Sequence, residues 1–208
     1  MGGYTAAVLT VSDHCSAGTA VDTSGPCVAD MLRAAGYDVV HTAIVPDEQE
    51  QIRAALLHCC DALHADLVVT TGGTGLSPRD VTPEATRAVL EREIPAIPQA
   101  MLYASLQITP HAMLSRAVAG TRGGTLLVNL PGSEKAAREN LSAVLPALGH
   151  GLKMMAGGGN KNRLLSHISI YISFCRTLSC GYNYSFLPLG ISLHINLHNL
   201  LLFSSICH

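Results

Sequence analysis

The chain has 208 residues, enough for one domain of ordinary size and some additional sequence. All fifteen Asp and Glu residues lie before Gly157, with ten of the thirteen Lys and Arg residues, which gives that part a net charge of −5. This acidity argues against general nucleic-acid binding, which needs a basic surface, but it leaves room for a local phosphate site.

Apolar runs and helix-start signals alternate along the acidic part of the chain. Strands are predicted at residues 4–11, 37–45, 66–70 and 124–130. Helices are predicted at residues 24–35, 47–63, 82–91 and 99–106, and from Ser133 onward. We expect Asp47 and Ser133 to act as helix N-caps, and we expect Pro146 to interrupt the last helix.

Strands separated by helices predict an α/β fold, a three-layer sandwich in which a mostly parallel sheet is covered on both faces. Ligands of such sheets bind beyond the carboxyl ends of the strands. Four loops rich in small or acidic residues leave strands at that edge: 12–13, 47–48, 72–80 and 131–133. We expect them to converge on one site.

The loop after the third predicted strand holds three glycines within four residues: Gly72, Gly73 and Gly75. Such a loop can bring backbone N–H groups against a phosphate, because no Cβ blocks the approach. Its G-G-T-G spacing fits neither a Walker loop nor the dinucleotide fingerprint. A tight turn would need glycine as well, so the loop alone leaves both interpretations open. The adjacent Arg79 and Asp80 favour phosphate and metal binding, since a plain turn requires no charged pair.

The sequence from Gly157 onward has a different composition. It has no acidic residue, holds six of the nine aromatic residues, and shows neither clear helical periodicity nor strand alternation. Residues 191–207 are apolar, but His and Asn residues interrupt the run, so we expect no membrane-spanning helix. We therefore predict a domain over residues 1–156 and an atypical apolar, acid-free tail over residues 157–208 that is not an evolved domain.

The start of the chain and its cysteines predict the cellular location. Residues 1–4 show no basic segment followed by a long apolar run, so we expect no secretory signal. The four cysteines of the acidic part form no C-x-x-C pair and no zinc-like spacing. We expect reduced thiols and a cytoplasmic protein.

The acidic part resembles the molybdenum-cofactor biosynthesis domains of the MogA/MoaB type, which include the G domains of gephyrin and of plant fusion proteins. The loop T-G-G-T-G followed by P-R-D-V-T-P-E-A is the most specific match. The matching stretches are residues 10–13, 22–25, 45–48, 70–75, 78–86, 108–110, 113–116 and 129–132. The resemblance covers about residues 5–155 and implies the MogA/MoaB-like fold.

The resemblance implies a molybdopterin adenylyltransferase, which uses Mg²⁺ to transfer AMP from ATP to the molybdopterin phosphate and releases pyrophosphate. Such a reaction needs positioning and charge neutralisation rather than a protein nucleophile, because the substrate phosphate itself attacks. Asp47 and Asp80 match the family's essential acids, and we expect both to hold Mg²⁺ and to be catalytic. Two alternatives stay open: Asp47 as a simple helix N-cap, and Asp80 as a partner for Arg79.

The resemblance also implies two substrate-binding sets. The expected ATP-binding residues are Ser12, Asp13, Gly72, Gly73, Thr74 and Gly75. The expected molybdopterin-binding residues are Ser105, Ser115, Arg116, Pro131, Gly132 and Ser133. A guanidinium such as that of Arg116 suits phosphate recognition. Ser12 and Asp13 could instead be turn formers, and Ser105 could be a helix-surface hydroxyl.

The family resemblance further implies a homotrimer and a molybdate-inserting partner that receives adenylyl-molybdopterin. Two other functions remain open. The chain could be a scaffold module that binds molybdopterin without turnover. It could also be an enzyme of related fold that cleaves a pyrophosphate in a nucleotide, as in competence-damage-type proteins, although these lack the full P-R-D-V-T-P-E-A continuation.

Overall fold

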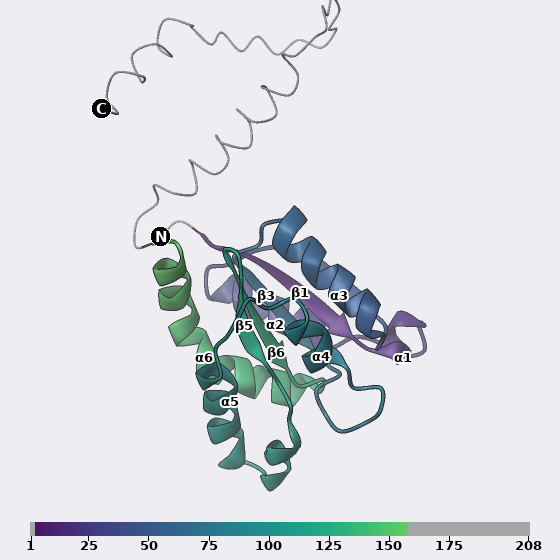
Figure 1. Ribbon diagram of the computed structural model, residues 1–208. Helices are drawn as coiled ribbons and strands as arrows, with labels where there is room; N and C mark the ends of the chain where they lie inside the picture. The colour runs from purple at the N-terminus through teal and green to yellow at the C-terminus, as the bar shows by residue number, and fades with distance from the viewer. Residues whose placement is uncertain (1–2, 158–208) are drawn as a thin grey trace, which may run out of the picture. The chain divides into compact units, whose positions relative to one another are not determined.

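The structure is a computed structural model, and it describes residues 3–157 (Figure 1). The tail predicted over residues 157–208 lies outside the described residues apart from Gly157. No helix within residues 3–157 combines the length and the apolar character that crossing a bilayer requires.

In the described part of the chain, six strands form one sheet in the order β2-β1-β3-β6-β5-β4. Their bounds are β1 (Thr5–Val11), β2 (Asp38–Val45), β3 (Leu67–Thr71), β4 (Arg92–Glu93), β5 (Ala119–Arg122) and β6 (Thr125–Leu130). Strands β2, β1, β3 and β6 are parallel, while β5 runs antiparallel to β6, and β4 antiparallel to β5. The mostly parallel sheet predicted from the sequence is therefore confirmed.

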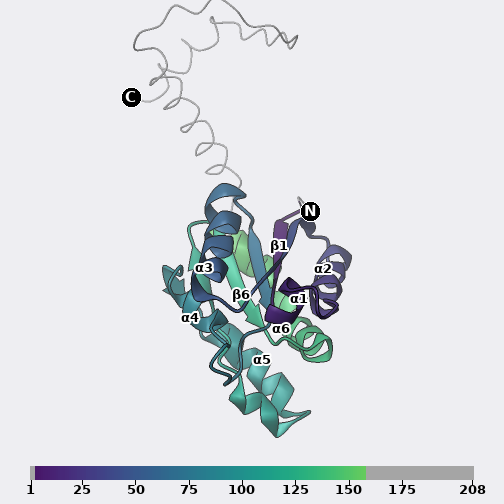
Figure 2. The same cartoon turned by 90° about the vertical axis from the view of Figure 1, so that its right-hand side faces the viewer.

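Helical segments connect the strands and cover the sheet. Their bounds are α1 (Asp13–Ser16), α2 (Ser24–Ala34), α3 (Gln49–Leu57), the π-helical turn η1 (His58–Ala62), α4 (Thr82–Arg87), α5 (Ala96–Leu106), the 3₁₀ turn η2 (Pro110–Leu114) and α6 (Glu134–Met155). Figure 2 shows the sheet between α3 on one side and α2 on the other.

The central strands β1, β3 and β6 bury side chains on both faces, which makes the three-layer sandwich. Along β1, Ala6 and Val8 pack with the helices α2, α5 and α6, whereas Ala7 and Leu9 pack with α3, η1 and α4. Successive strand residues point to opposite faces, so an uninterrupted apolar run serves two cores at once. The second core also contains Cys59 and Cys60, and the four cysteines of the described part are free thiols, as predicted.

The antiparallel edge of the sheet was not predicted from the sequence. Strand β4 has two residues, and β5 reads Ala-Gly-Thr-Arg, so neither contains the apolar run that marks a strand. The glycine in β5 is explained by the neighbouring strand, because a Cβ on Gly120 would lie 2.3 Å from the carbonyl oxygen of Arg92 on β4. Close approach of the neighbouring backbone requires glycine here.

Two predictions about the helices were wrong. Asp47 does not cap α3, which begins at Gln49 after Glu48, because its carboxylate accepts a hydrogen bond from the distant Asp13 N–H instead. Pro146 does not interrupt α6, which runs unbroken for 22 residues. Pro146 is exposed, so the carbonyl group that it leaves unpaired can bond to water.

Prolines also misled the prediction for α5, which starts at Ala96 rather than Gln99. Pro95 occupies the N-cap position and Pro98 lies in the first turn. The first N–H groups of a helix have no partner inside the helix, so proline costs little there. The helix predicted at residues 82–91 ends earlier, at Arg87.

We propose that residues 1–157 fold without residues 158–208, because the described residues form a six-stranded sheet and two hydrophobic clusters among themselves. A fragment ending at Gly157 is expected to keep its helical circular dichroism and a single cooperative thermal transition. A fragment that is unfolded, or that melts without cooperativity, would show that the tail belongs to the domain.

Candidate active site

The four loops predicted to converge leave the sheet at one edge. Register pairs place Val11 beside Val45, Thr10 beside Thr71, and Thr71 beside Leu130, so β1, β2, β3 and β6 end nearly level. The next residues keep this order, since Gly72 N–H donates to the Leu130 carbonyl oxygen at 3.1 Å. The prediction that residues far apart in sequence meet beyond this edge is confirmed.

The glycines of the loop after β3 make close contacts, and the contact at Gly72, which is with backbone, requires glycine. A Cβ on Gly72, which has φ +104°, would lie 2.1 Å from the Val11 carbonyl oxygen. A Cβ on Gly75 would lie 2.8 Å from Asp80 Oδ2. The loop therefore does form a tight turn that needs glycine. It can also bind a ligand, because the same loop lines two cavities.

The smaller cavity has a volume of about 230 Å³ and lies directly at the strand ends. Six predicted site residues line it: Ser12, Asp47, Gly72, Gly73, Asp80 and Gly132. Its wall is polar, and much of it comes from the loop before α2. Ser12 serves the local turn as well, since its Oγ accepts from Cys15 N–H at 3.2 Å at the start of α1.

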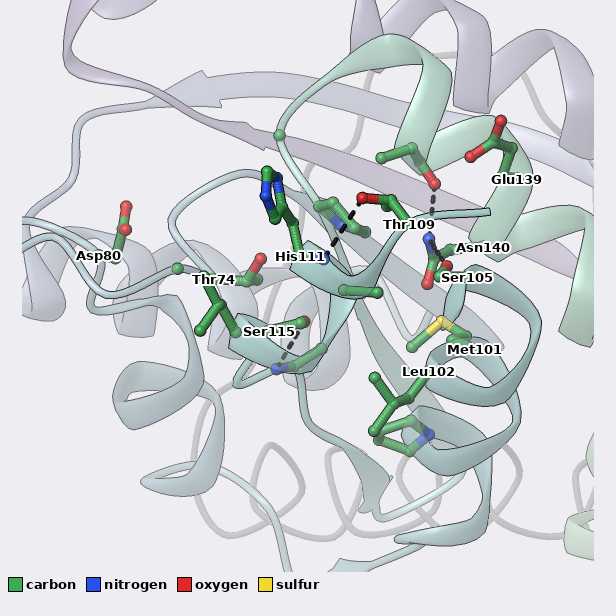
Figure 3. Close-up of a pocket in the computed structure, with 18 of the residues that line it drawn as sticks. Thr74, Asp80, Met101, Leu102, Ser105, Thr109, His111, Ser115, Glu139 and Asn140 are labelled. Carbon is green, nitrogen blue, oxygen red and sulfur yellow. Dashed lines mark hydrogen bonds between the residues drawn. The ribbon is translucent and has the colours of Figure 1, made fainter. Parts of the chain in front are cut away.

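The larger cavity has a volume of about 540 Å³ and lies between the glycine loop, α5, η2 and α6 (Figure 3). Six predicted site residues line it in addition to Gly73 and Asp80: Thr74, Gly75, Ser105, Ser115, Pro131 and Gly132. Figure 3 shows Asp80 at one end and Glu139 at the other. Gly73, Asp80 and Gly132 line both cavities, so the two spaces adjoin.

Ser105 is part of this larger cavity and not a surface hydroxyl. It is buried, and its Oγ accepts a hydrogen bond from Asn140 Nδ2 at 3.0 Å. The same Asn140 amide also donates to the Ala136 carbonyl oxygen at 2.8 Å. The bond to Ser105 ties α5 to α6 at the deep end of the cavity, so the alternative interpretation of Ser105 is wrong.

Two aspartates hold each other's backbone across the edge of the sheet. Asp13 N–H donates to Asp47 Oδ2 at 2.8 Å, and Asp47 N–H donates to Asp13 Oδ1 at 3.0 Å. This reciprocal pair fixes the loop after β1 against the loop after β2. It leaves Asp47 Oδ1 without a hydrogen-bond partner among the residues that the structure describes.

Arg79 pairs with acids other than its neighbour. Its guanidinium donates to both carboxylate oxygens of Asp13, at 3.0 and 3.1 Å, and to Glu48 Oε1 at 2.8 Å. Asp80 instead accepts a hydrogen bond from Ser77 N–H at 3.0 Å. The alternative in which Asp80 serves only as a partner for Arg79 is therefore wrong.

The electrostatics of Asp13 and Asp47 differ. The Arg79 guanidinium, together with the Asp47 N–H, lowers the pKa of Asp13 below its usual range. Burial raises the pKa of Asp47, and the negative charges of Asp13 and Asp80 add to the rise. Asp47 and Asp80 thus repel each other across a cavity, a situation that a bound cation relieves.

No group of three or more His, Cys, Asp or Glu side chains within residues 3–157 has the arrangement of a metal site. Three carboxylates of the described part line the smaller cavity, those of Asp22, Asp47 and Asp80. Both oxygens of Asp22 already accept hydrogen bonds from the protein. Mg²⁺ is commonly held by one or two carboxylates, with substrate phosphates and water completing its shell. The residues present fit that ion, since Asp47 offers an unpartnered oxygen and Asp80 stands near it.

Arg116 holds the glycine loop in place. Its Nε donates to the Gly75 carbonyl oxygen at 2.7 Å, and its two terminal nitrogens donate to the Asp80 carbonyl oxygen and to Glu84 Oε1.

In the part of the chain that the structure describes, three predicted site residues line neither cavity: Arg116, Asp13 and Ser133. The phosphate-binding role expected for Arg116 stays a prediction. Ser133 caps α6 as predicted, its Oγ accepting from Ala136 N–H at 3.3 Å.

The comparisons with known proteins agree with this geometry. Residues 7–150 match the family described as "Probable molybdopterin binding domain". The chain belongs to this family.

Two relatives and one solved structure of this molybdopterin-binding family illustrate the likeness. Molybdopterin adenylyltransferase of Helicobacter pylori strain J99 is 41% identical over 152 residues, which are 72% of this chain and 86% of that protein. Gephyrin of Dictyostelium discoideum is 46% identical over 158 residues, 71% of this chain and 22% of that protein. The MoaB structure from Thermus thermophilus has a TM-score of 0.71 at 46% identity, covering 74% of this chain and 97% of that one.

Sequence reasoning missed several residues of this molybdopterin-binding domain that line the cavities. Asp22 lines the smaller one, where it accepts from Thr10 Oγ1 at 2.6 Å and from Gly25 N–H at 2.9 Å. Its place in the matching stretch 22–25 was an available signal. Glu139 and Asn140 line the larger cavity from α6, but the sequence around them contains no motif.

Replacing Arg116 by Gln is expected to destabilise the fold by about 1–3 kcal/mol, because the carbonyl groups of Gly75 and Asp80 and the Glu84 carboxylate lose their charged donor. Urea unfolding measures the change. The control is Arg138→Gln, which breaks an exposed helix pair with Glu134 and is expected to cost about 0–1 kcal/mol. Equal losses in the two variants would show that Arg116 does not brace the loop.

The pKa of Asp47 is raised and that of Asp13 is lowered, so replacing each residue by asparagine is expected to change the stability of the fold in opposite directions. At pH 7, Asp47→Asn is expected to be more stable than the wild type, because ionised Asp47 is disfavoured in the fold. Its advantage should disappear as the pH falls below the ordinary value of 3.8, where Asp47 is neutral in both states.

Asp13→Asn is expected to be less stable at pH 7, and its deficit should shrink as the pH falls from the ordinary value of 3.8 through the lowered pKa of Asp13, below which the residue is neutral in both states. Urea midpoints of the three proteins at pH 7, 5 and 3 check both signs. Shifts of the same sign in the two variants at pH 7 would contradict the electrostatic picture.

Proposed function

We propose that the chain is a molybdopterin adenylyltransferase that transfers AMP from ATP to the phosphate of molybdopterin and releases pyrophosphate. The observation that carries the proposal is the pair of adjoining cavities, one small, polar and acidic, the other larger and mostly apolar. A reaction between two bound substrates needs two such spaces with a shared wall. The adenylyltransferase name of a relative that the chain covers over most of its length supports the same assignment.

We assign the nucleotide phosphates to the smaller cavity and molybdopterin to the larger one. Ser12, Gly72 and Gly73 line the smaller cavity, as expected for ATP-binding residues. Thr74 and Gly75 were predicted to bind ATP as well, but they line the larger cavity. We therefore propose that they contact the molybdopterin phosphate, next to the point of transfer.

The reacting groups must meet where the cavities adjoin, beside Gly73, Asp80 and Gly132. There an oxygen of the molybdopterin phosphate attacks the α-phosphorus of ATP, the bond from that phosphorus to the bridging oxygen breaks, and pyrophosphate leaves. Glycine at positions 73 and 132 lets both phosphates approach the backbone. The contribution of the protein is mainly the orientation of two phosphates that would otherwise repel each other.

Asp47 and Asp80 are the residues that would hold Mg²⁺. When bound, the ion supplies neutralisation of phosphate charge. Both carboxylates are held by backbone N–H groups, Asp47 by that of Asp13 and Asp80 by that of Ser77. Each is therefore oriented by the fold itself, so little reorganisation is required on binding.

We also propose, from the family resemblance, a cytoplasmic homotrimer that delivers its product to a molybdate-inserting partner. Exposed apolar side chains on α5 and η2, such as Tyr103 and Met113, support association with another protein surface. Light scattering on the fragment of residues 1–157 gives its mass in solution. A mass of one chain at micromolar concentration would exclude the trimer.

A non-catalytic scaffold module of the gephyrin G-domain type is the second candidate, and the gephyrin of Dictyostelium discoideum is 46% identical over 158 residues. Incubation with molybdopterin, ATP and Mg²⁺ separates the two functions. An adenylyltransferase is expected to form adenylyl-molybdopterin and pyrophosphate in equal amounts. Binding of molybdopterin without either product would favour the scaffold, whereas AMP released without molybdopterin would favour a nucleotide pyrophosphatase.

Asp80→Asn and Asp47→Asn are expected to lower the rate of this transfer at least about 100-fold, because each removes one carboxylate charge from the nucleotide site. The fold should remain intact, since the amide oxygen of asparagine can still accept the backbone N–H bond. Asp30→Asn, which changes an exposed acid on α2, is the control and should leave the rate unchanged. Full activity in Asp80→Asn would refute the role given to that residue.

A further inference from the structure

Thr82 has a feature that neither its place in the helix nor the proposed reaction explains. It is fully buried at the start of α4, yet its Oγ1 has no hydrogen-bond partner within residues 3–157. Valine has nearly the same shape and would avoid the cost of burying an unbonded hydroxyl. A buried hydroxyl without a partner therefore requires a reason, and the surroundings of Thr82 supply one.

The hydroxyl of Thr82 lies against Gly73, the glycine that both cavities share. A Cβ on Gly73 would lie 2.4 Å from Thr82 Oγ1 and 2.9 Å from Asp47 Oδ1. The backbone of Thr82 also donates to the Gly73 carbonyl oxygen at 3.1 Å. The absence of a side chain at Gly73, where φ is +62°, thus leaves the Thr82 hydroxyl and the Asp47 carboxylate facing the same small gap.

The two oxygens that meet at this gap complement each other chemically. Asp47 Oδ2 is already occupied by Asp13 N–H, while Asp47 Oδ1 has no partner among the described residues. A hydroxyl can donate one hydrogen bond, and a carboxylate oxygen can accept one while also binding a cation. Both oxygens border the point that a Cβ on Gly73 would occupy.

We infer that Thr82 is a positioning residue whose hydroxyl donates to Asp47 Oδ1 when a divalent cation and nucleotide occupy the smaller cavity. The inference rests on the proposed function, because it needs a cation at Asp47. Thr82 acts through Asp47 and touches neither substrate. Its hydroxyl gains this bond when the cation and nucleotide are bound, which favours the loaded state.

The test compares Thr82→Val and Thr82→Ser in the full-length chain, with Mn²⁺ plus ATP as the probe and water proton relaxation as the readout. Thr82→Val is expected to bind the probe about tenfold more weakly than the wild type, while its urea midpoint stays equal or rises. Thr82→Ser keeps the hydroxyl and is expected to bind within about twofold of the wild type. Thr125→Val is the control: it removes a buried hydroxyl bonded to the Ala65 carbonyl oxygen, so it should lower stability and leave binding unchanged.

The outcomes separate this inference from the proposed function. Binding of Mn²⁺ and ATP that depends on the Thr82 hydroxyl, without formation of adenylyl-molybdopterin, would support the inference and contradict the adenylyltransferase. Equal binding by Thr82→Val, or binding by Thr82→Ser as weak as that of Thr82→Val, would overturn the inference. Absence of probe binding in the wild type would overturn it as well, since no cation would then reach Asp47.

Discussion

The close packing of backbones where the parallel strands end is the constraint on which the site depends. At Gly72 the chain passes so near Val11 that any side chain would collide with a carbonyl oxygen, and Gly132 approaches Gly72 from the next strand. Three loops therefore meet with almost no side chains between them. The resulting space lies against main-chain groups, which suits phosphates, because small anions bind to backbone N–H groups without steric hindrance.

A glycine-rich loop whose large apolar residue, Leu76, is exposed is not held by the hydrophobic core, so polar groups from outside the loop hold it. Arg116 reaches the loop from the segment before β5 and bonds to the carbonyl groups of Gly75 and Asp80. Fixing the Asp80 backbone fixes the direction of its carboxylate, which lines both cavities. A residue expected to bind phosphate thus shapes the proposed phosphate site by holding its loop, although it lines neither cavity.

The sequence predicted those elements whose structure depends on interactions between residues that are neighbours in the chain. Three of the four parallel strands, β1, β3 and β6, are mainly apolar and buried, and the edge where they end follows from their direction. The antiparallel edge lacked that signal because its pairing is set by contacts such as Gly120 against Arg92. Asp47 was misread as a helix cap because its true partner, Asp13, lies 34 residues away. Pairings between distant residues of this kind can be found only from the fold.

The carboxylates around the smaller cavity differ in their partners, since some are paired with Arg79 and others are not. The guanidinium of Arg79 pairs with Asp13 and Glu48, neither of which lines the cavity. Asp47 and Asp80 do line it, and their carboxylates receive only backbone N–H bonds. Had Arg79 paired with Asp80, its adjacent residue, the cavity would carry less negative charge and would offer less to a cation. Under the proposed function, this arrangement places unpaired negative charge beside the nucleotide phosphates, which would repel the nucleotide unless a divalent ion comes with it.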